Sequence, residues 1–540
     1  MKLRHLQKLA AVTVMAMLVT VSSCKKNLTP QGELTTANVY TNYANYLQVV
    51  AKLYDAFAIS GQAGGAGNPD IAGIDEGFGN YFREYINMEE LTTDEVSIIW
   101  NDHTIHNLHD MNWDQNDIFI TAIYDRIYYQ ISLDNEFLRN TTDALLAKNG
   151  ITGAQVTTVH QYRAEARFLR ALAYTHAIDI FGSVPLVTEA DPVGVFFPVQ
   201  KTRTEVFNYV ESELKAIDGD LGAPRFSYGH ADKGAEWALL AKLYLNAKVY
   251  TGTDRSTDAI TYASKVIAAG YSLEPKFANM FAADNNLSNE MIFPIESDAN
   301  STQGYGGMTY LIHAEIGGNM NAADYGAGGT GPAWAGFRTT KQYVALFNDP
   351  TDPNGASDTR AMFFTNGQTL EMTSEFNFNN GYAIAKFSNL TSTGAWGGGN
   401  PSLAFVNTDF PAFRLADMYL TYAEAYLRGG AGGDATTALH YVNLVRERAY
   451  AGSESGNGDI TAAQLTLPFI LDERGREFLL EGQRRTDLIR FGEFTNGTYL
   501  WAWKGGVLGG ASVGDYRNLM PIPSAQISLN PTLKQNNGYN

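Results

Sequence analysis

Long helical segments with small residues on their faces constrain this fold more than any other feature of the sequence. Residues 160–181 repeat apolar side chains at three- and four-residue steps and include five alanines. This spacing predicts an amphipathic helix, and its small residues let a second helix approach closely. Gly182 follows as the expected C′ residue, and Pro185 prevents the helix from continuing. Residues 41–59 and 116–138 show the same periodicity and are also predicted to be helices.

Two helical hairpins fit the tetratricopeptide (TPR) template, in which large, small and aromatic residues of a first helix pack on an alanine-containing second helix. Residues 419–426 and 435–442 form one hairpin, with Asp434 as the N-cap. Residues 237–244 match the first helix again, and their partner at 263–270 comes later than the template allows. The sequence therefore predicts a mostly α fold of TPR-like helical hairpins, an α-α superhelix. A helical bundle without true repeats is the alternative.

The N-terminal residues have the pattern of an exported, lipid-anchored protein. A basic start precedes Leu9–Val21, which carries no charge and is too short to cross a hydrocarbon core of about 30 Å. The only cysteine follows at position 24, where the residues 21–24 (VSSC) resemble a bacterial lipobox. We expect a signal peptide over residues 1–23, lipidation at Cys24 and a lipidated tether over residues 24–35. An ordinary secretory signal with an incidental cysteine is the alternative.

The acidic balance of the chain argues against two classes of partner. The net charge is −18 at pH 7, and removal of residues 1–23 changes it to −21. Nucleic acid phosphates require neutralisation by Lys and Arg, so we expect no nucleic acid partner. An acidic surface also disfavours lying flat on anionic headgroups, so the lipid is expected to hold the protein at the membrane. Because no second cysteine exists, packing rather than disulfides must supply the stability.

Glycine and aromatic residues gather in the middle of the chain. Residues 301–336 contain ten glycines with three tyrosines and a tryptophan between them, and residues 61–79 and 394–399 are also rich in glycine. Compact proteins rarely keep long loops without a use, so we expect the ligand-binding part here. The expected division is an N-terminal TPR-like region with surface loops over 36–276, a Gly/aromatic-rich insert over 277–410, and C-terminal hairpins with a tail over 411–540.

Five segments resemble one family, the SusD/RagB outer-membrane lipoproteins of nutrient uptake. In the family's order they are residues 163–189, 414–428, 442–448, 471–492 and 519–539. The resemblance implies four TPR-like helix pairs that carry an irregular ligand-binding part. It also implies a surface-exposed protein of the outer membrane that captures a glycan for a partner TonB-dependent (SusC-like) transporter. Because the family also includes binders of peptides and other nutrients, a peptide ligand is the alternative.

The segment that follows residues 93–95 (TDE) offers chemistry suited to sugars. Sugar rings present apolar C–H faces beside hydroxyl groups, so aromatic faces with nearby amide or carboxylate groups can hold them. The resemblance implies that Trp100 and Asn101 form one side of a glycan platform and that the middle insert forms the other side. For every aromatic candidate, a packing role is the alternative, because most large apolar residues are buried. The predicted ligand-binding residues are Trp100, Asn101, Asp102, Trp113, Tyr305, Tyr310, Tyr325 and Trp334.

Carboxylates that share a helix face raise the possibility of an enzyme. Glu473, Glu477 and Glu481 recur at four-residue steps, as acid–base groups could. Arginines surround them, however, and such patterns are more typical of ion pairs between helices. Asp94-Glu95 could be half of a glycosidase pair, but no motif supplies the second carboxylate. We therefore predict a non-catalytic protein and keep a surface hydrolase as the weaker alternative.

Metal binding has two candidate clusters, neither with a signature spacing. His103, His106 and His109 lack a zinc motif such as HExxH and are interpreted as unrelated histidines. Three carboxylates in the glycine-rich stretch could bind calcium, although they do not match an EF-hand. We predict no cofactor and leave calcium open. These carboxylates are Asp70, Asp75 and Glu76.

Overall fold

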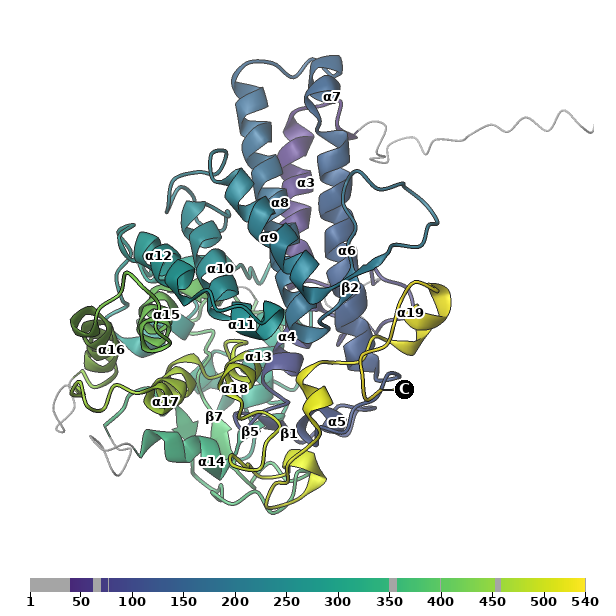
Figure 1. The fold of residues 1–540 in the computed structure, drawn as a ribbon. Helices are drawn as coiled ribbons and strands as arrows, with labels where there is room; N and C mark the ends of the chain where they lie inside the picture. The colour runs from purple at the N-terminus through teal and green to yellow at the C-terminus, as the bar shows by residue number, and fades with distance from the viewer. Residues whose placement is uncertain are drawn as a thin grey trace, which may run out of the picture.

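The computed structural model describes residues 39–61, 69–75, 77–348, 357–398, 400–451 and 458–539, and it is mostly helical (Figure 1). Cys24, the predicted signal peptide and tether, and Glu76 lie outside the described residues. No described helix is long and apolar enough to cross a membrane. The α-helices are α3 (Ala44–Ala58), α4 (Tyr81–Glu89), α5 (His106–His109), α6 (Ile118–Asn140), α7 (Asp143–Lys148), α8 (Ala154–Ile180), α9 (Arg203–Ile217), α10 (Lys233–Leu245), α11 (Ala247–Thr251), α12 (Ser256–Ile267), α13 (Gly307–Glu315), α14 (Lys341–Val344), α15 (Leu415–Leu427), α16 (Ala435–Ala449), α17 (Leu467–Phe478), α18 (Arg484–Phe491) and α19 (Ser524–Leu529). Short 3₁₀ helices are η1 (Phe277–Phe281), η2 (Asn285–Leu287), η3 (Ala322–Tyr325), η4 (Ala345–Phe347), η5 (Lys504–Gly506) and η6 (Asp515–Asn518).

The three helices predicted from periodicity are confirmed as α3, α6 and α8. Asp117 caps α6, because its side chain accepts hydrogen bonds from the backbone N–H groups of Phe119 and Ile120. α8 ends where Gly182 adopts a φ of +75° and its N–H returns to the carbonyl of Ile178. The chain then enters the short strand that contains Pro185, so the predicted helix stop is also confirmed.

The helices pack as TPR-like pairs, which confirms the predicted fold class. α15 packs on α16 and α10 packs on α12, as the two template matches predicted, and α12 also packs on α15, so the two pairs stack. α11 occupies the long connection between α10 and α12. α8 packs against both α6 and α9, and α3 lies along α6 and α8. In Figure 1 the long α3, α6 and α8 stand side by side, and α12, α15 and α16 group on the other flank of the molecule.

Short strands from distant parts of the sequence form small antiparallel sheets. One sheet has the order β1-β5-β7-β6, so a strand before residue 100 pairs with strands of the middle insert. In this sheet Ser97 lies opposite Arg338, and Ile98 lies opposite Phe337. The strands are β1 (Ser97–Ile98), β2 (Val184–Pro185), β3 (Gln200–Lys201), β4 (Met291–Ile295), β5 (Phe337–Thr339), β6 (Phe363–Phe364), β7 (Tyr382–Ile384) and β8 (Phe410–Arg414), with β2 paired to β3 and β4 to β8.

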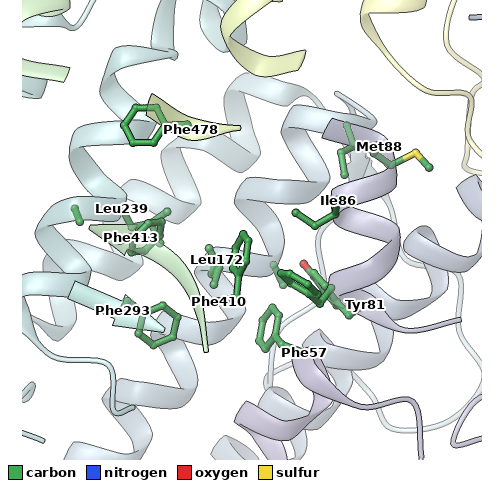
Figure 2. Packing of buried hydrophobic residues seen from close by; sticks show 14 of the residues in the cluster. Phe57, Tyr81, Ile86, Met88, Leu172, Leu239, Phe293, Phe410, Phe413 and Phe478 are labelled. Atoms are coloured by element: carbon green, nitrogen blue, oxygen red, sulfur yellow. The ribbon is translucent and has the colours of Figure 1, made fainter. Parts of the chain in front are cut away.

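One hydrophobic core joins the N-terminal and C-terminal helices through the β4–β8 ribbon. Figure 2 shows Phe57 and Tyr81 of the N-terminal helices close to Phe410 of β8. On the other side of β8, Phe413 lies 5.9 Å from Phe293 of β4, measured between ring centroids. Each of these rings is almost completely buried, so the N-terminal and C-terminal helices pack around one interior.

A buried ion-pair network fills the other part of the interior, around α17. Arg414 pairs with Glu290 at 2.9 Å, with Glu477 at 2.5 Å and with Glu481 at 2.6 Å. Burial alone would raise the pKa of Glu477, but the arginines at 448, 414 and 360 lower it to about 2. A carboxylate that stays ionised and fully paired cannot exchange protons near neutral pH. The structural interpretation of Glu473 and Glu477 is therefore supported over a catalytic one. Glu481 does not share their helix face as predicted, because α17 ends at Phe478, and it pairs with Arg414 and Lys386.

Replacing Arg414 with alanine should destabilise the fold strongly. Arg414→Ala leaves three buried carboxylates without their shared cation, and breaking a buried pair typically costs about 3–5 kcal/mol. Arg163→Ala is the matched control, because Arg163 pairs with Asp143 at the surface, where a pair is worth about 0–1 kcal/mol. Urea unfolding followed by circular dichroism measures both variants. Equal losses would show that the network does not hold the fold.

Candidate functional site

The pairing of β1 with β5 brings two tryptophans together. Trp100 follows β1 and Trp334 precedes β5, so the antiparallel pairing places both at the same end of the ladder. The Nε1–H of Trp100 donates a hydrogen bond to the carbonyl of Trp334 at 2.9 Å. A Cβ on Gly336 would lie only 2.9 Å from Cζ2 of Trp100, so the absence of a side chain there lets the indole pack against the strand.

Tyr305 joins the tryptophans from the loop before α13. The next residue, Gly306, packs so closely on Asn80 that a Cβ would lie 2.4 Å from the Cβ of Asn80, the residue that caps α4. The rings of Tyr305, Trp334 and Trp100 form an aromatic row with Trp334 at its centre. The centroid of Trp334 lies 6.2 Å from that of Tyr305, with 56° between the planes, and 6.3 Å from that of Trp100, with 51° between the planes. Three rings inclined in this way form a curved surface.

This aromatic row forms one wall of an open pocket of about 560 Å³. The segment before α4 and the start of α6 also line the pocket, through Phe78 and Phe119, whose ring centroids lie 5.2 Å apart. The ring of His103, which follows β1, lies 5.8 Å from that of Phe78. His103 has a φ of +49°, an unusual conformation for a side-chain-bearing residue and one that is frequent at functional sites. The residues that line the pocket are Asp75, Gly77, Phe78, Arg83, Trp100, Asp102, His103, Phe119, Tyr305 and Trp334.

Arg83 of α4 places a positive charge at the base of the pocket. Its Cζ lies 4.2 Å from the ring centroid of Tyr310 and 5.7 Å from that of Trp100, so two aromatic faces hold the guanidinium. Its Nη1–H donates to the carbonyl of Gly77 at 3.0 Å, whereas its buried Nε makes no hydrogen bond to the described residues. A buried donor without a partner is costly, so the arrangement favours a ligand or a water molecule that accepts from Arg83.

The carboxyl group of Glu84, the residue next to Arg83, does not neutralise the guanidinium. Burial raises the pKa of Glu84 to about 8, although Arg83 and a hydrogen bond from Asn87 act in the opposite direction. Glu84 is therefore largely protonated at neutral pH and does not form a neutralising carboxylate. The hydroxyl of Tyr310 in turn donates to Oδ1 of Asn87 at 2.8 Å, which ties this chain to the aromatic wall.

Glu84 should make the stability of the protein fall as pH rises. Its pKa is about 8 in the folded state and near 4.5 in the unfolded state, so between these values the folded chain binds more protons. The wild type should therefore lose stability relative to Glu84→Gln by at least about 2 kcal/mol between pH 5 and pH 8. Urea unfolding at several pH values tests this. The exposed Glu371 gives the control variant Glu371→Gln, and identical pH profiles for both variants would contradict the expectation.

The structure brings four of the predicted ligand-binding residues to this pocket: Trp100, Asp102, Tyr305 and Trp334. Asn101 is exposed between Trp100 and Asp102 but does not line the pocket. Tyr325 lies at the end of η3, half-buried against the core, and does not reach the pocket.

Two predicted ligand contacts are wrong, because the side chains are completely buried. Trp113 is 0% exposed, and its Nε1–H donates to the hydroxyl of Tyr539 at 2.7 Å. Tyr310 is also 0% exposed and packs behind Trp100, beneath Arg83. For these two aromatics the packing alternative holds, and Tyr310 acts on the site only through the side chains that it supports.

The sequence prediction missed Arg83 and Phe78, and it listed Asp75 and His103 only as metal ligands. Asp75 and Phe78 lie in the glycine-rich stretch at 61–79 that was expected to be functional. The composition therefore predicted the region but did not identify which residues line the pocket. Arg83 sits in the first turn of a helix, and no local pattern distinguishes it from other helical arginines.

The candidate metal ligands do not assemble in the described residues. Within this part of the chain, no three His, Cys, Asp or Glu side chains are arranged to hold a metal ion. Both ring nitrogens of His109 face backbone carbonyls in the interior. Asp70 is paired with Arg126 at 2.6 Å and with Lys52 at 3.4 Å, and Glu76 lies outside the described residues, so calcium binding stays an open question.

Helix pairs that carry an aromatic, loop-built pocket define a TPR-like ligand-binding protein, and comparison with known proteins gives its family. The chain is 34% identical to the starch-binding protein SusD of Bacteroides thetaiotaomicron over 589 aligned residues that cover all of both chains. The family model described as the SusD family matches residues 353–539, and the one described as starch-binding and associating with the outer membrane matches residues 73–245. The chain therefore belongs to the SusD family.

Solved structures confirm the fold. A SusD superfamily protein of Bacteroides vulgatus superposes with a TM-score of 0.69 at 19% identity, covering 92% of this chain and 99% of the other. Surface glycan-binding protein A from Bacteroides fluxus superposes with a TM-score of 0.67 at 20% identity, covering 92% of this chain and 100% of the other.

Proposed function

We propose that this protein is a non-catalytic, lipid-anchored glycan-binding protein of the cell surface. It captures a glycan in the pocket beside Trp334 and passes it to a partner TonB-dependent (SusC-like) transporter. The observation that carries the proposal is the row of three exposed or half-buried rings with the Arg83 guanidinium at its base. Aromatic faces suit the C–H faces of sugar rings, and Arg83, Asp75 and Asp102 suit their hydroxyl groups.

The shape of the aromatic row favours a curved glycan. Neighbouring planes are inclined by 51° and 56°, so a flat, extended chain cannot lie on all three rings at once. A helical α-1,4-linked glucan turns its successive sugar faces and can follow this curvature. The name of the relative that is 34% identical, a starch-binding protein, supports the same class of ligand. We therefore propose starch-type α-glucans as the ligand.

Calorimetric titration of residues 25–540 tests the ligand class directly. The panel contains maltoheptaose, cellohexaose as a straight β-linked control, and mixed peptides for the alternative ligand class. We expect heat with maltoheptaose only and unchanged oligosaccharide length by chromatography afterwards. Heat with peptides alone would overturn the glycan proposal, and shortened oligosaccharides would overturn the non-catalytic proposal.

Removing the most exposed ring of the row should weaken binding without unfolding the protein. Tyr305 is 39% exposed, so Tyr305→Ala removes a stacking face that contributes little to the core. Loss of one aromatic stack typically costs about 0.5–1.5 kcal/mol, which corresponds to an about 2- to 12-fold weaker Kd for maltoheptaose. Tyr516→Ala is the matched control, because Tyr516 is 38% exposed at η6 and does not line the pocket. Equal affinity of the two variants would remove Tyr305 from the site.

The anchor is tested by Cys24→Ala in the full-length chain. If Cys24 carries the lipid, the variant should move from the membrane fraction to the soluble fraction and lose labelling by a fatty-acid analogue. Binding of maltoheptaose should be unchanged, because the pocket is built from residues after position 74. A variant that keeps its label and its membrane association would show that Cys24 is not the anchor.

A further inference from the structure

A second pocket, of about 220 Å³, lies between α3, the turn at residues 228–230 and β4. None of its lining residues belongs to the glycan pocket. Four of its lining residues are exposed, so the pocket is open to solvent: Leu47, Ala51, Tyr228 and Glu296. Its volume is below the roughly 300–1,000 Å³ of pockets for drug-sized ligands, which indicates a small guest.

The walls of this pocket are aromatic and aliphatic. Tyr54 and Phe57 of α3 face Phe293 of β4 and Tyr228 of the turn, and the centroids of Tyr54 and Phe293 lie 6.4 Å apart. Phe57 and Phe293 are the buried rings that Figure 2 shows on either side of the β8 strand. Aromatic faces carry negative electrostatic potential, and a pocket lined by several of them favours a cation with apolar substituents.

Two carboxylates without a hydrogen-bond donor add negative charge to these walls. Asp55 and Glu296 both line the pocket, and neither side chain accepts a hydrogen bond from the described residues. Burial raises the pKa of both groups, although His230 acts in the opposite direction on Glu296 and Lys52 does so on Asp55. The charge of Asp55 also raises the pKa of Glu296, which indicates that the two carboxylates repel each other. A cationic guest between them would relieve this repulsion.

The backbone of the turn is shaped around one of these carboxylates. A Cβ on Gly229 would lie 1.5 Å from Oε1 of Glu296, so the carboxylate rests against the bare Cα of the glycine. This contact keeps Glu296 beside the pocket rather than free in solvent.

Among the described residues, the cations near this pocket already have anionic partners: Lys52, which lowers the pKa of Asp55, pairs with Asp70 at 3.4 Å. No lysine or arginine is among the described residues that line it. The remaining titratable base, His230, is bound to the completely buried carboxylate of Glu165 at 2.8 Å, so the pair adds no net positive charge. Tyr54 donates to the same carboxylate at 2.7 Å, which fixes its ring as a wall.

From these observations we propose that the α3 pocket binds a small organic cation, a primary amine or guanidinium on a short apolar stem. The alkyl stem lies against Phe57 and Phe293, and the charged head lies between Asp55 and Glu296. The pocket is distinct from the glycan site, so this proposal does not depend on the glycan that the protein binds.

Titration of residues 25–540 with n-pentylamine, and with n-pentanol as the uncharged isostere, tests the proposal without any substitution. We expect pentylamine to bind with a Kd of about 0.1–10 mM and pentanol to bind at least tenfold more weakly. Chemical shifts of a ¹⁹F label on tyrosine report whether Tyr54 and Tyr228 sense the amine. Equal binding of amine and alcohol would overturn the proposal, because the pocket would then select only apolar surface.

Two variants distinguish amine binding in this pocket from non-specific attraction to the acidic surface. Glu296→Gln keeps the shape of the side chain, removes one charge, and should weaken pentylamine binding at least fivefold. Asp220→Asn is the matched control, because Asp220 is exposed and does not line the pocket, and because the substitution removes the same amount of charge. Maltoheptaose binding should be unchanged in both variants. Equal effects of the two substitutions on the amine would mean non-specific attraction and would overturn the proposal.

Discussion

The bidentate ion pair between Arg484 and Asp94 is the contact on which the position of the ligand site depends. Nε and Nη2 of Arg484 each lie 2.8 Å from one carboxylate oxygen of Asp94, and both side chains are buried. Close by, Oε1 of Glu90 accepts a hydrogen bond from the backbone N–H of Gln483. Paired charges of this geometry are directional, and losing one partner in the interior is strongly unfavourable. The C-terminal helices therefore fix the segment that leads into β1.

From Asp94 this constraint reaches the aromatic row in two short steps. The hydroxyl of Thr340 donates to the carbonyl of Asp94 at 2.6 Å, which joins the end of β5 to the start of β1. The pairing of β1 with β5 then places Trp100 beside Trp334. Arg83 belongs to the same unit, because α4 ends in Glu89, which pairs with Arg485 at 3.2 Å. A loop-built site on such a scaffold loses little freedom when a ligand binds, which lowers the entropic cost of recognition.

Local patterns explain why the helices and hairpins could be predicted and why half of the site could not. The periods of α3, α6 and α8 and the spacing of α15 and α16 are properties of short segments. Burial depends instead on distant parts of the chain. Trp100 and Trp113 occur in one polar segment, but the C-terminal residues Arg517 and Tyr539 pack on the second indole. Arg83 likewise looks like any helical arginine until the sheet brings two aromatic faces over it. Long-range pairing therefore decides which aromatic residues become ligand contacts.

The charge beside an aromatic surface decides what that surface can bind. In the glycan pocket the protein's own guanidinium already occupies the faces of Tyr310 and Trp100, and it shares the pocket with the carboxylates of Asp75 and Asp102. Neutral hydroxyl groups can accept from Arg83 and donate to Asp75 or Asp102 there. In the α3 pocket the described lining residues include aromatic rings and two carboxylates but no lysine or arginine, so this aromatic surface favours a cation. Similar aromatic walls thus give the protein two chemically separate sites, because each has a different charge at its edge.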